Sequence, residues 1–465
     1  MTENLIQKCI PVVPRSVSGR FRMLKYSILV LAYGVYYLLP WWRWERNSGP
    51  DQAVVFDIVA RKFYIFDLVV YAQDMFWLTG FLVIAAFLLF FVTGIAGRVF
   101  CGYFCFQTLW TDVFILIERL VQGERNARIK LINSPPTLNK TIKLSLTQFL
   151  WFLVALITGL SFTLYWGNAP ELLMQMVTGQ APFPAYATTF FLTVTTFVMA
   201  GMAREQVCTY MCPYSRFQAV MFDQDTLIVA YDEQRGEGEQ GRWKPIKGLL
   251  KRDERQAKGY GDCIDCGFCV QVCPVGIDIR NGLQYQCISC ALCIDACNTI
   301  MDSINYPRGL IRYSSEHQMH GRRWSWLKMK NLGYSVAILI VTGLLIWSIV
   351  TRQLTELRVQ QIRQPLYVTL SDGQIQNRYE VKMTNKHDQA QRYRIHIEGL
   401  PGAILDVGHF SEVSLNTGES VHLQVHIKMR PDKQSVKNRH FYFVLQNLST
   451  NPTVSIKQPA QFYLP

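Results

Sequence analysis

Eight of the thirteen cysteines in this chain lie between residues 263 and 297, and their spacing predicts a definite chemistry. The motif C-x2-C-x2-C-x3-C occurs there twice, and a proline follows the first copy. Two-residue gaps allow three thiolates of one tight loop to reach three irons of a cubane, as in bacterial ferredoxins that hold two clusters. The cysteines are Cys263, Cys266, Cys269 and Cys273 in the first copy, and Cys287, Cys290, Cys293 and Cys297 in the second.

We therefore predict two [4Fe-4S] clusters with crossed ligands, because the last cysteine of each run binds the other cluster in such pairs. A disulfide framework would require an oxidising compartment, and structural zinc uses pairs of C-x2-C rather than triplets. The second run ends in Cys-Asn instead of Cys-Pro, a small departure from the simple ferredoxin form. The predicted sets are Cys263, Cys266, Cys269 and Cys297 for one cluster, and Cys287, Cys290, Cys293 and Cys273 for the other.

Two further cysteine pairs have the spacing C-x3-C. They are Cys101 with Cys105, in C-G-Y-F-C, and Cys208 with Cys212, in C-T-Y-M-C. An arginine shortly precedes each pair, and matching cysteines are 107 residues apart in both cases. This offset suggests an internal repeat of a two-helix hairpin. It predicts that the two pairs meet at one site near the cytoplasmic face of a membrane.

Four neighbouring thiols suit a soft metal ion such as Cu(I), or a redox-active dithiol. In a helix, the spacing i, i+4 would place both sulfur atoms of a pair on one face. Pro213 disfavours helix at Cys212, so a turn is also consistent with the sequence. The simpler alternative is that these cysteines are small apolar residues at helix ends. Cys9 lies alone near the N-terminus and stays unassigned.

The elements that must position these cysteines are membrane helices. Half of the 465 residues are apolar, 13% are aromatic and only 17% are charged, which favours a membrane protein with soluble parts. Five stretches reach the roughly 20 apolar residues that a spanning helix requires. The first is too long and too aromatic for a signal peptide. The predicted spans are 24–43, 76–97, 147–167, 183–202 and 332–351.

The basic residues predict the orientation of these spans. Residues 98–146 and 203–331 contain seven and seventeen Lys or Arg residues, whereas 168–182 contains none. This places the N-terminus and both basic segments in the cytoplasm, and residues 352–465 outside, in the periplasm beyond a bacterial inner membrane. The net charge of +13 then reflects cytoplasmic loops. No basic run with interleaved aromatics indicates a nucleic-acid partner.

Residues 52–71 are apolar but include four charged residues. Charges at mid-bilayer are costly, so we predict an interfacial or re-entrant element on the outer face. The alternative is a sixth span, which would invert everything after it. All eight histidines lie after residue 316, which excludes a haem held by paired histidines in the first four spans.

Three other residue pairs could bind a metal, and each has a simpler explanation. The methionines could bind copper through thioethers, but we expect them to make apolar contacts at the membrane interface. The first histidine pair lies in a solvated segment before the last span, and the second would share one strand face without a third ligand. The pairs are Met174 and Met176, His317 and His320, and His422 and His426.

After residue 352 the hydropathy pattern changes to the period of two that is typical of half-buried strands. About seven short strands in roughly 100 residues would be typical of an immunoglobulin-like β-sandwich. We predict this fold for the segment, although the clear runs fall short of that number, and we interpret the domain as an interaction module. The alternating runs are 365–370, 377–385, 391–399, 419–429 and 440–447.

The predicted fold is a multi-domain membrane protein. An α-helical transmembrane bundle of about five spans holds an inserted two-cluster bacterial ferredoxin module, and an immunoglobulin-like β-sandwich follows. Residues 232–258 are charged and glycine-rich, which indicates a connector to the cluster module. The predicted divisions are 1–231 for the tail and four spans, 232–331 for the connector and ferredoxin module, 332–351 for the fifth span and 352–465 for the sandwich.

With these residues together, the chain resembles the FixG/CcoG family of cytochrome c oxidase accessory proteins over nearly its whole length. The resemblance depends on GRVFCGYFCFQTLWTD at 97–112, REQVCTYMCPYSRFQAVMFD at 204–223, the eight-cysteine segment and the terminal sandwich. Phe106 is a departure, because the family usually has proline after the second cysteine of the first pair.

The resemblance implies a role in maturation of cbb3-type cytochrome oxidase, through reduction of Cu(II) to Cu(I) for delivery to the oxidase. It implies partners of four kinds: the lipid bilayer, a copper ion, oxidase-assembly or copper-delivery factors, and an electron donor that the sequence does not identify. Two alternatives stay open, an electron-transfer subunit that exchanges electrons with quinol and a non-catalytic scaffold for oxidase assembly. The catalytic, copper-handling residues implied by the family are Cys101, Cys105, Cys208 and Cys212.

Overall fold

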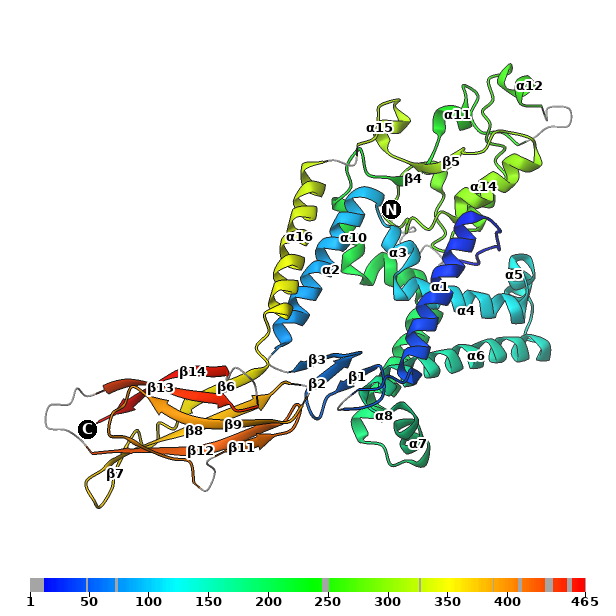
Figure 1. The fold of residues 1–465 in the computed structure, drawn as a ribbon. Helices are drawn as coiled ribbons and strands as arrows, with labels where there is room; N and C mark the ends of the chain where they lie inside the picture. The colour runs from blue at the N-terminus through cyan, green and yellow to red at the C-terminus, as the bar shows by residue number, and fades with distance from the viewer. Residues whose placement is uncertain are drawn as a thin grey trace, which may run out of the picture. The chain divides into compact units, whose positions relative to one another are not determined.

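The computed structural model divides into two compact units (Figure 1). The first unit, Met1–Trp44 with Asp51–Leu345, contains the long helices and the cysteine-rich segment. The second, Glu45–Pro50 with Ile346–Pro465, contains a β-sandwich. The residues that the structure describes are 12–46, 49–71, 74–244, 251–325, 328–387, 389–408, 412–430, 438–449 and 454–464.

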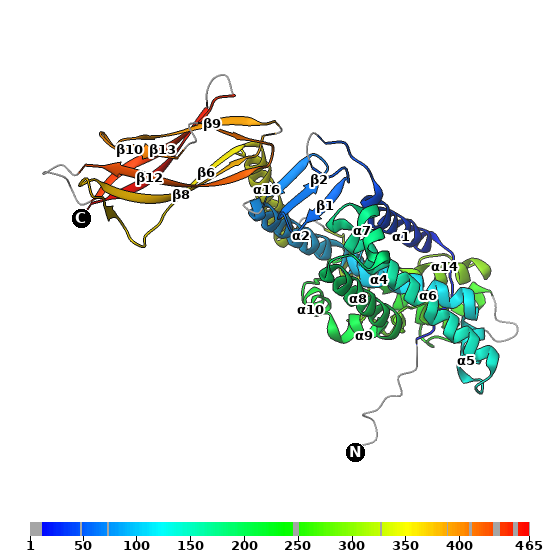
Figure 2. The same cartoon turned by 90° about the horizontal axis from the view of Figure 1, so that it is seen from below.

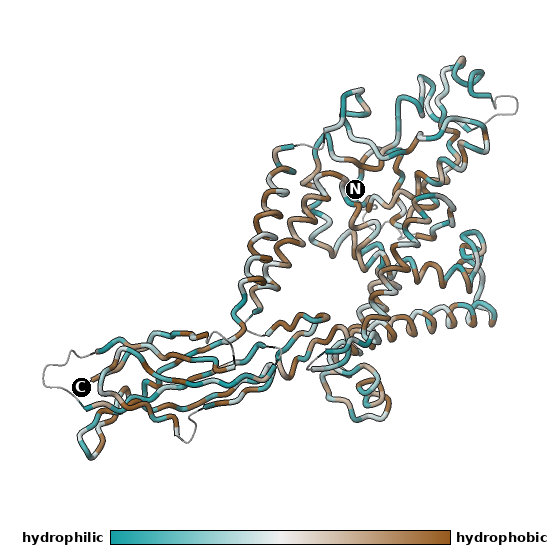
Figure 3. The backbone as a smooth tube through the Cα atoms, viewed as in Figure 1, coloured by the Kyte–Doolittle hydropathy of each residue, from teal (hydrophilic) through white to brown (hydrophobic). Residues whose placement is uncertain are grey.

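Within these residues, six helical stretches are long and apolar enough to cross a membrane. Five of them coincide with the predicted spans, and the apolar surface of α2 and α16 is evident in Figure 3. The sixth, Val99–Gln122, was not among the predicted spans, because residues 98–146 were assigned to a basic cytoplasmic segment. The five are built from α1 (Arg20–Leu38), α2 (Met75–Ala96), α6 (Leu138–Thr163), α8 (Phe183–Thr196) and α16 (Met329–Val350).

The sixth stretch comprises two helices, α3 (Val99–Tyr103) and α4 (Phe106–Gln122). One face of α4 is buried against α6. Phe114 stacks on Trp151 with ring centroids 5.2 Å apart, and the Trp110 indole donates a hydrogen bond to the Thr158 hydroxyl at 2.9 Å. Packing against protein on one side explains how α4 can carry polar and charged residues on its buried face.

Residues 52–71 form a small antiparallel sheet rather than a helix. The strands are β1 (Val54–Asp57), β2 (Lys62–Ile65) and β3 (Leu68–Tyr71), in the order β1-β2-β3. Arg61 and Phe66 adopt positive φ at the two tight turns. The alternative of a sixth helical span at this place is therefore wrong, because an open three-stranded sheet cannot satisfy its edges in lipid.

The C-terminal end of α6 lies beside the C-terminal end of α1. The Tyr36 hydroxyl donates to the Thr158 carbonyl at 2.8 Å, and the Tyr165 hydroxyl donates to the Tyr36 carbonyl at 3.0 Å. The buried amide of Gln52 donates to the Leu164 carbonyl at 3.1 Å, which joins the small sheet to the same place. The ends of α1 and α6 consequently lie on one side of the helical bundle.

The cysteine-rich segment is framed by α13 (Phe268–Gln271), α14 (Leu292–Ser303) and a two-stranded sheet of β4 (Ile228–Tyr231) and β5 (Ile311–Ser314). Because β4 pairs with β5, this module begins before the predicted boundary at residue 232.

The predicted connector is also more ordered than expected. It contains α11 (Glu233–Glu237) and α12 (Arg252–Gln256), which fold against the module. The buried Arg255 guanidinium donates to the Gly261 carbonyl at 3.3 Å, next to the first cluster-type loop. The segment is therefore part of the module over its described residues and not a simple linker.

The C-terminal unit is a sandwich of two antiparallel sheets (Figure 2). Four of the five predicted runs are strands, whereas only Val368–Thr369 of the run 365–370 is a strand. Its core includes Tyr379, Phe441 and Phe443, whose rings pack at 5.2–5.8 Å between centroids. One sheet contains β10 (Ile404–Asp406), β12 (Ser420–Met429), β8 (Ile375–Asn385) and β6 (Thr355–Gln361), with β7 (Val368–Thr369) beside β8; the other contains β11 (Val413–Leu415), β9 (Gln391–Glu398), β13 (Asn438–Asn447) and β14 (Val454–Tyr463).

Candidate functional site

The eight clustered cysteines line two separate cavities. Apolar side chains make up most of the remaining lining of both cavities. Cys269 borders both cavities, and each of the other seven thiols borders one. The first cavity is lined by Cys263, Cys266, Cys269 and Cys297, and the second by Cys273, Cys287, Cys290 and Cys293, with Cys269 at its edge.

The chemistry of these cavities fits iron–sulfur cubanes. No three His, Cys, Asp or Glu side chains among the described residues converge as ligands of a single ion, and a cubane does not require this because each thiolate binds a different iron. Burial raises the pKa of the Cys269 and Cys273 thiols to about 12. A bound cationic metal would therefore have to displace these protons, as thiolate ligation requires.

The two cysteine loops share an unusual backbone conformation. Asp265 and Gly267 flank the middle cysteine of the first loop and have φ of 47° and 66°. Ser289 and Ala291 occupy the same positions in the second loop, with φ of 53° and 60°. Non-glycine residues rarely adopt positive φ, and alternation of this kind turns backbone N–H groups toward one concavity that suits an anionic group. The repeat indicates that both loops are shaped for the same kind of ligand.

Ion pairs fix the first loop from outside. The buried carboxylate of Asp262 accepts from Arg235 at 2.7 Å and from Arg252 at 2.9 Å. Burial alone would raise the pKa of Asp262, but these hydrogen bonds outweigh it and lower the pKa. Arg280 in turn binds Asp278 at 2.7 Å and Asp265 at 2.5 Å, which holds the loop residue with positive φ.

The two C-x3-C pairs have the same local structure, as an internal repeat would have. Cys101 lies in α3, and Cys105 is the extended residue before α4, with φ −65° and ψ 126°. Cys208 lies in a π-helical turn, Val207–Met211, and Cys212 is the extended residue before α10 (Pro213–Val220), with φ −81° and ψ 109°. The second cysteine of each pair is thus not helical, so a regular i, i+4 helical face is the wrong description.

The first pair contacts the second cluster-type loop directly. A Cβ atom added to Gly102 would lie 2.7 Å from the Ile288 carbonyl oxygen and 3.0 Å from the backbone of Cys290. The neighbouring Tyr103 hydroxyl donates to the Cys290 carbonyl at 3.1 Å. Cys101 packs in the same apolar group as Cys290 and Cys293. Glycine is needed here because any side chain would push the two backbones apart.

Gln218 of α10 joins both pairs to this loop through a buried network. Its side-chain oxygen accepts from the Cys101 thiol at 3.1 Å and from Arg98 Nε at 3.2 Å, and its amide donates to the Thr93 hydroxyl at 3.2 Å. Arg98 also donates to the carbonyl of Cys287 at 3.4 Å. The end of α2, the first pair and the second cluster-type loop are therefore tied to α10, which follows the second pair.

Glu118 of α4 positions the segment before the second pair. Its carboxylate is buried and accepts two hydrogen bonds from Arg204, at 2.6 and 3.1 Å. Arg128 binds the same carboxylate from α5 (Arg125–Asn133). Such bidentate pairs fix orientation as well as charge. Arg204 is the arginine that precedes Cys208, and its ion pair with Glu118 ties the segment before this cysteine to α4.

The thiols of the two pairs influence one another electrostatically. Burial raises the pKa of Cys208 to about 11, and the adjacent thiols of Cys105 and Cys212 add to the rise. No three of the four converge on a single point, since no group of three potential metal ligands exists among the described residues. The arrangement offers soft ligands for a transient ion rather than a preformed cage.

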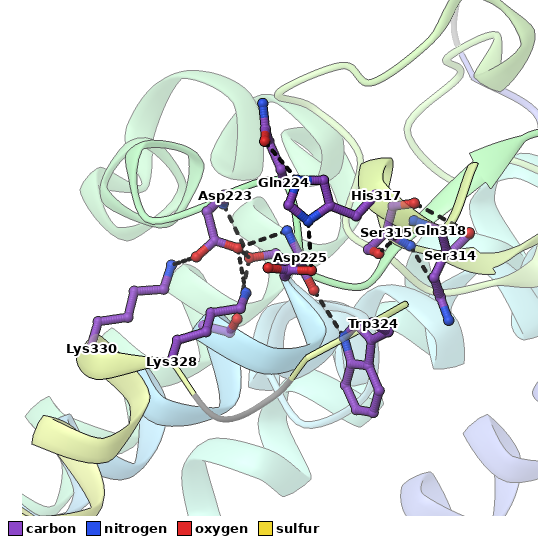
Figure 4. A network of polar contacts seen from close by, with 12 residues as sticks. Asp223, Gln224, Asp225, Ser314, Ser315, His317, Gln318, Trp324, Lys328 and Lys330 are labelled. Atoms are coloured by element: carbon purple, nitrogen blue, oxygen red, sulfur yellow. Dashed lines mark hydrogen bonds and ion pairs between the residues drawn. The ribbon is translucent and has the colours of Figure 1, made fainter. Parts of the chain in front are cut away.

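His317, one of the two histidines before α16, belongs to a polar network (Figure 4). His317 uses both ring nitrogens, at 2.9 Å from Asp225 and 2.8 Å from Gln224, so neither is free for a metal. Asp223 binds Lys328 and Lys330. Burial opposes the charge of Asp223, but the lysine hydrogen bonds outweigh it and hold the pKa well below its usual range. The network joins β5, the loop after α10 and the start of α16.

The remaining predicted ligand candidates do not form sites. His422 and His426 share one face of β12, and a carboxylate does lie beside His422, since Glu380 is 3.1 Å away; no third ligand joins them in the described residues. Met174 lies on α7 (Ala169–Thr178) with 63% of its surface exposed. Cys9 lies outside the described residues.

Sequence reasoning missed several residues that hold this site together. Gly102, Gln218, Lys25 and Asp112 are common residue types in stretches that read as ordinary helix. The one signal that could have drawn attention to Lys25 is a lysine near the start of a membrane span, where charge is costly unless paired. Asp112, with which Lys25 forms an ion pair, lies nearly ninety residues later in the sequence. The spacing of residues could not identify this pair.

Known families match most of this architecture. Residues 203–316 match the 4Fe-4S dicluster domain, and residues 345–465 match the immunoglobulin-like fold at the C-terminus of FixG. The chain is 43% identical to Protein RdxB of Cereibacter sphaeroides, over 87% of this chain and 88% of that protein. Protein RdxA of the same organism is 42% identical, over 86% and 85% of the two chains.

The third relative extends over still more of the chain. The nitrogen fixation protein FixG of Rhizobium meliloti is 37% identical over 92% of this chain and 86% of its own length. All three relatives are thus similar to this chain over most of its length. The chain belongs to the FixG family, and it is a multi-pass membrane protein with an iron–sulfur electron-transfer domain and an immunoglobulin-like domain.

Proposed function

We propose that this protein is a membrane-bound reductase that converts Cu(II) to Cu(I) in the maturation of cbb3-type cytochrome oxidase. The observation that supports it most strongly is the direct contact of Gly102 and Cys101 with the loop of Cys287, Cys290 and Cys293. Soft thiols next to an electron source suit an ion that becomes softer on reduction.

We assign the ligands of each cluster from the cysteines that line each cavity. Cys263, Cys266, Cys269 and Cys297 would hold one [4Fe-4S] cluster, and Cys273, Cys287, Cys290 and Cys293 the other, so the last cysteine of each run crosses over. When bound, such clusters supply electrons one at a time, which matches the single electron that Cu(II) accepts.

The thiols of Cys101, Cys105, Cys208 and Cys212 would bind the copper ion during its reduction. Since burial keeps the Cys208 thiol protonated at neutral pH, binding of the ion releases protons from the ligands. Delivery to the oxidase would follow through its assembly or copper-delivery factors.

We further propose five membrane crossings, with the cluster module in the cytoplasm and the sandwich in the periplasm. The contacts between Tyr36, Thr158 and Tyr165 place the ends of α1 and α6 together. The segment from α3 to α5 then begins and ends on the cluster side, so the stretch Val99–Gln122 would not cross. This topology agrees with the many Lys and Arg residues in 98–146 and 203–331, since such residues are enriched in cytoplasmic segments.

The test uses full-length protein purified without oxygen in detergent. Cys208→Ser with Cys212→Ser should abolish Cu(II) reduction and leave the iron and sulfide content unchanged. Cys9→Ser is the matched control, because that cysteine belongs to neither set, and it should reduce Cu(II) as the unaltered protein does. Full activity in the double variant would contradict the proposal.

Two other functions predict different results in experiments of their own. An electron-transfer subunit would change cluster redox state with quinol and be indifferent to copper. A non-catalytic scaffold would support oxidase assembly even after the cluster cysteines are replaced. The direct contact between the first cysteine pair and the second cluster-type loop favours the reductase over both, since neither alternative needs it.

A further inference from the structure

A buried group of three charges lies beside the second cysteine cavity. Lys25 Nζ is 2.9 Å from Asp112 Oδ2, and Arg22 Nη1 is 3.5 Å from Asp112 Oδ1. The Lys25 side chain is only 1% exposed, and those of Arg22 and Asp112 are 8% and 6% exposed. Lys25 is the most deeply buried of the three charged residues, so solvent screens its charge least.

The group is held close to the cluster module by α1. The backbone N–H of Arg22 donates to Asp295 of α14 at 2.8 Å. A Cβ atom on Gly19, which precedes α1, would lie 2.2 Å from the Asp295 carboxyl carbon, so glycine allows this close approach. Helix α1 thus begins against the helix that carries Cys293 and Cys297.

One wall separates these charges from the second cavity. Val275 and Ile288 line both the cysteine cavity and a neighbouring pocket of about 350 Å³ that contains Lys25 and Asp112. These two residues lie next to the cysteine ligands in sequence, Val275 two residues after Cys273 and Ile288 directly after Cys287. Arg204 and Glu205 line the same pocket as a second pair of opposite charges.

We propose that Lys25, held by Asp112, is a positioning residue that raises the reduction potential of the cluster bound by Cys273, Cys287, Cys290 and Cys293. Reduction adds one negative charge to a cluster, so a nearby buried cation stabilises the reduced form. Net charge around the cluster is one of the factors that set its potential. Arg22, Lys25 and Asp112 are not among the residues that line the first cavity.

The position of Lys25 favours electron transfer toward the C-x3-C pairs. The cluster influenced by Lys25 is the one whose loop contacts Gly102, so a raised potential draws electrons to the cavity nearest the thiols. The inference depends on the proposed cluster ligands but not on copper reduction, and its test involves no copper.

The experiment is a potentiometric titration of full-length protein, followed by EPR without oxygen. Lys25→Met leaves Arg22 and Asp112 as a neutral pair, and it should lower one of the two midpoint potentials and leave the other unchanged. Lys25→Arg keeps the positive charge, so this midpoint potential should stay at the wild-type value. Asp112→Asn should shift the same potential in the opposite direction.

Three results would overturn the inference. They are an unchanged potential in Lys25→Met with both clusters retained, an equal shift of both clusters, or shifts of the same sign in Lys25→Met and Asp112→Asn. If Lys25→Met fails to retain its clusters, Lys25→Gln replaces it with the same expected direction. The double variant Lys25→Met with Asp112→Asn preserves the net charge. Its midpoint potential should therefore lie between those of the two single variants.

Discussion

Replacement of Gly102 by alanine tests the contact on which electron transfer to the cysteine pairs depends. The added methyl group would lie 2.7 Å from the Ile288 carbonyl, whereas an ordinary contact begins at 3.4 Å, so one backbone must move by about 0.7 Å. The atoms that it meets belong to backbone that also presents Cys287 and Cys290, and they cannot rotate away. Overpacking of this kind costs about 1–3 kcal/mol.

Alanine also favours helix over glycine, by about 0.5–1 kcal/mol, and this gain must be separated from the clash. Gly34 provides the matched control, because it lies within α1 and a Cβ atom there would meet nothing within 4 Å. Gly34→Ala should show the helical gain alone. The difference between the two variants then reports the clash, with Gly102→Ala less stable by about 1–3 kcal/mol.

The assay is a guanidinium titration without oxygen, followed by the visible absorbance of the clusters, with Cu(II) reduction measured in parallel. We expect Gly102→Ala to lose its clusters at lower denaturant and to reduce Cu(II) more slowly at equal iron content. Equal behaviour of Gly102→Ala and Gly34→Ala in both measurements would refute the close contact and the route that it supports.

Three further predictions concern other parts of the chain. Cys297→Ser should halve the bound iron rather than abolish it, because only the cavity with Cys263 and Cys266 loses a ligand; complete loss would show that the cavities are not independent. Asp223→Asn should make residues 315–325 more sensitive to limited proteolysis at neutral pH, since it breaks the links to Lys328 and Lys330. Folding lowers the pKa of Asp223, so the ion pairs stabilise the segment fully above the unfolded pKa of about 4. This stabilisation is lost only as the pH falls through the lower pKa of the folded state. If the wild type were no more resistant to proteolysis than Asp223→Asn already at pH 6, this prediction would be wrong. Phe443→Ala should destabilise the sandwich by about 3–5 kcal/mol, as measured by thermal unfolding, because this ring is fully buried, and iron content should not change if the two units fold separately.

The parts of this structure that could be predicted from sequence are those with local signals. The cysteine spacing, the apolar lengths and the alternating strands each repeat within a short window, and each appears in the structure. The edge strand β14 was missed because Pro459 interrupts its pattern, although proline is tolerated at a sheet edge. Residues 52–71 have apolar content that suits either a span or strands, and only tight turns at Arg61 and Phe66 decide between them.

The parts that could not be predicted depend on contacts between distant segments. Arg98 and Arg204 precede equivalent cysteine pairs, yet Arg98 binds Gln218 and the second loop, whereas Arg204 binds Glu118. A repeat in sequence does not indicate which partner each copy will meet. The same holds for Lys25 and Asp112, whose pairing becomes apparent only when α1 lies beside α4.

The most direct measurement of the central claim is EPR of the protein purified and reduced without oxygen, recorded before and after addition of Cu(II). The account predicts that the signals of the reduced clusters and of Cu(II) disappear together, with one Cu(II) ion reduced for each electron stored. A Cu(II) signal that persists beside reduced clusters, or a protein that contains no iron when prepared this way, would contradict it.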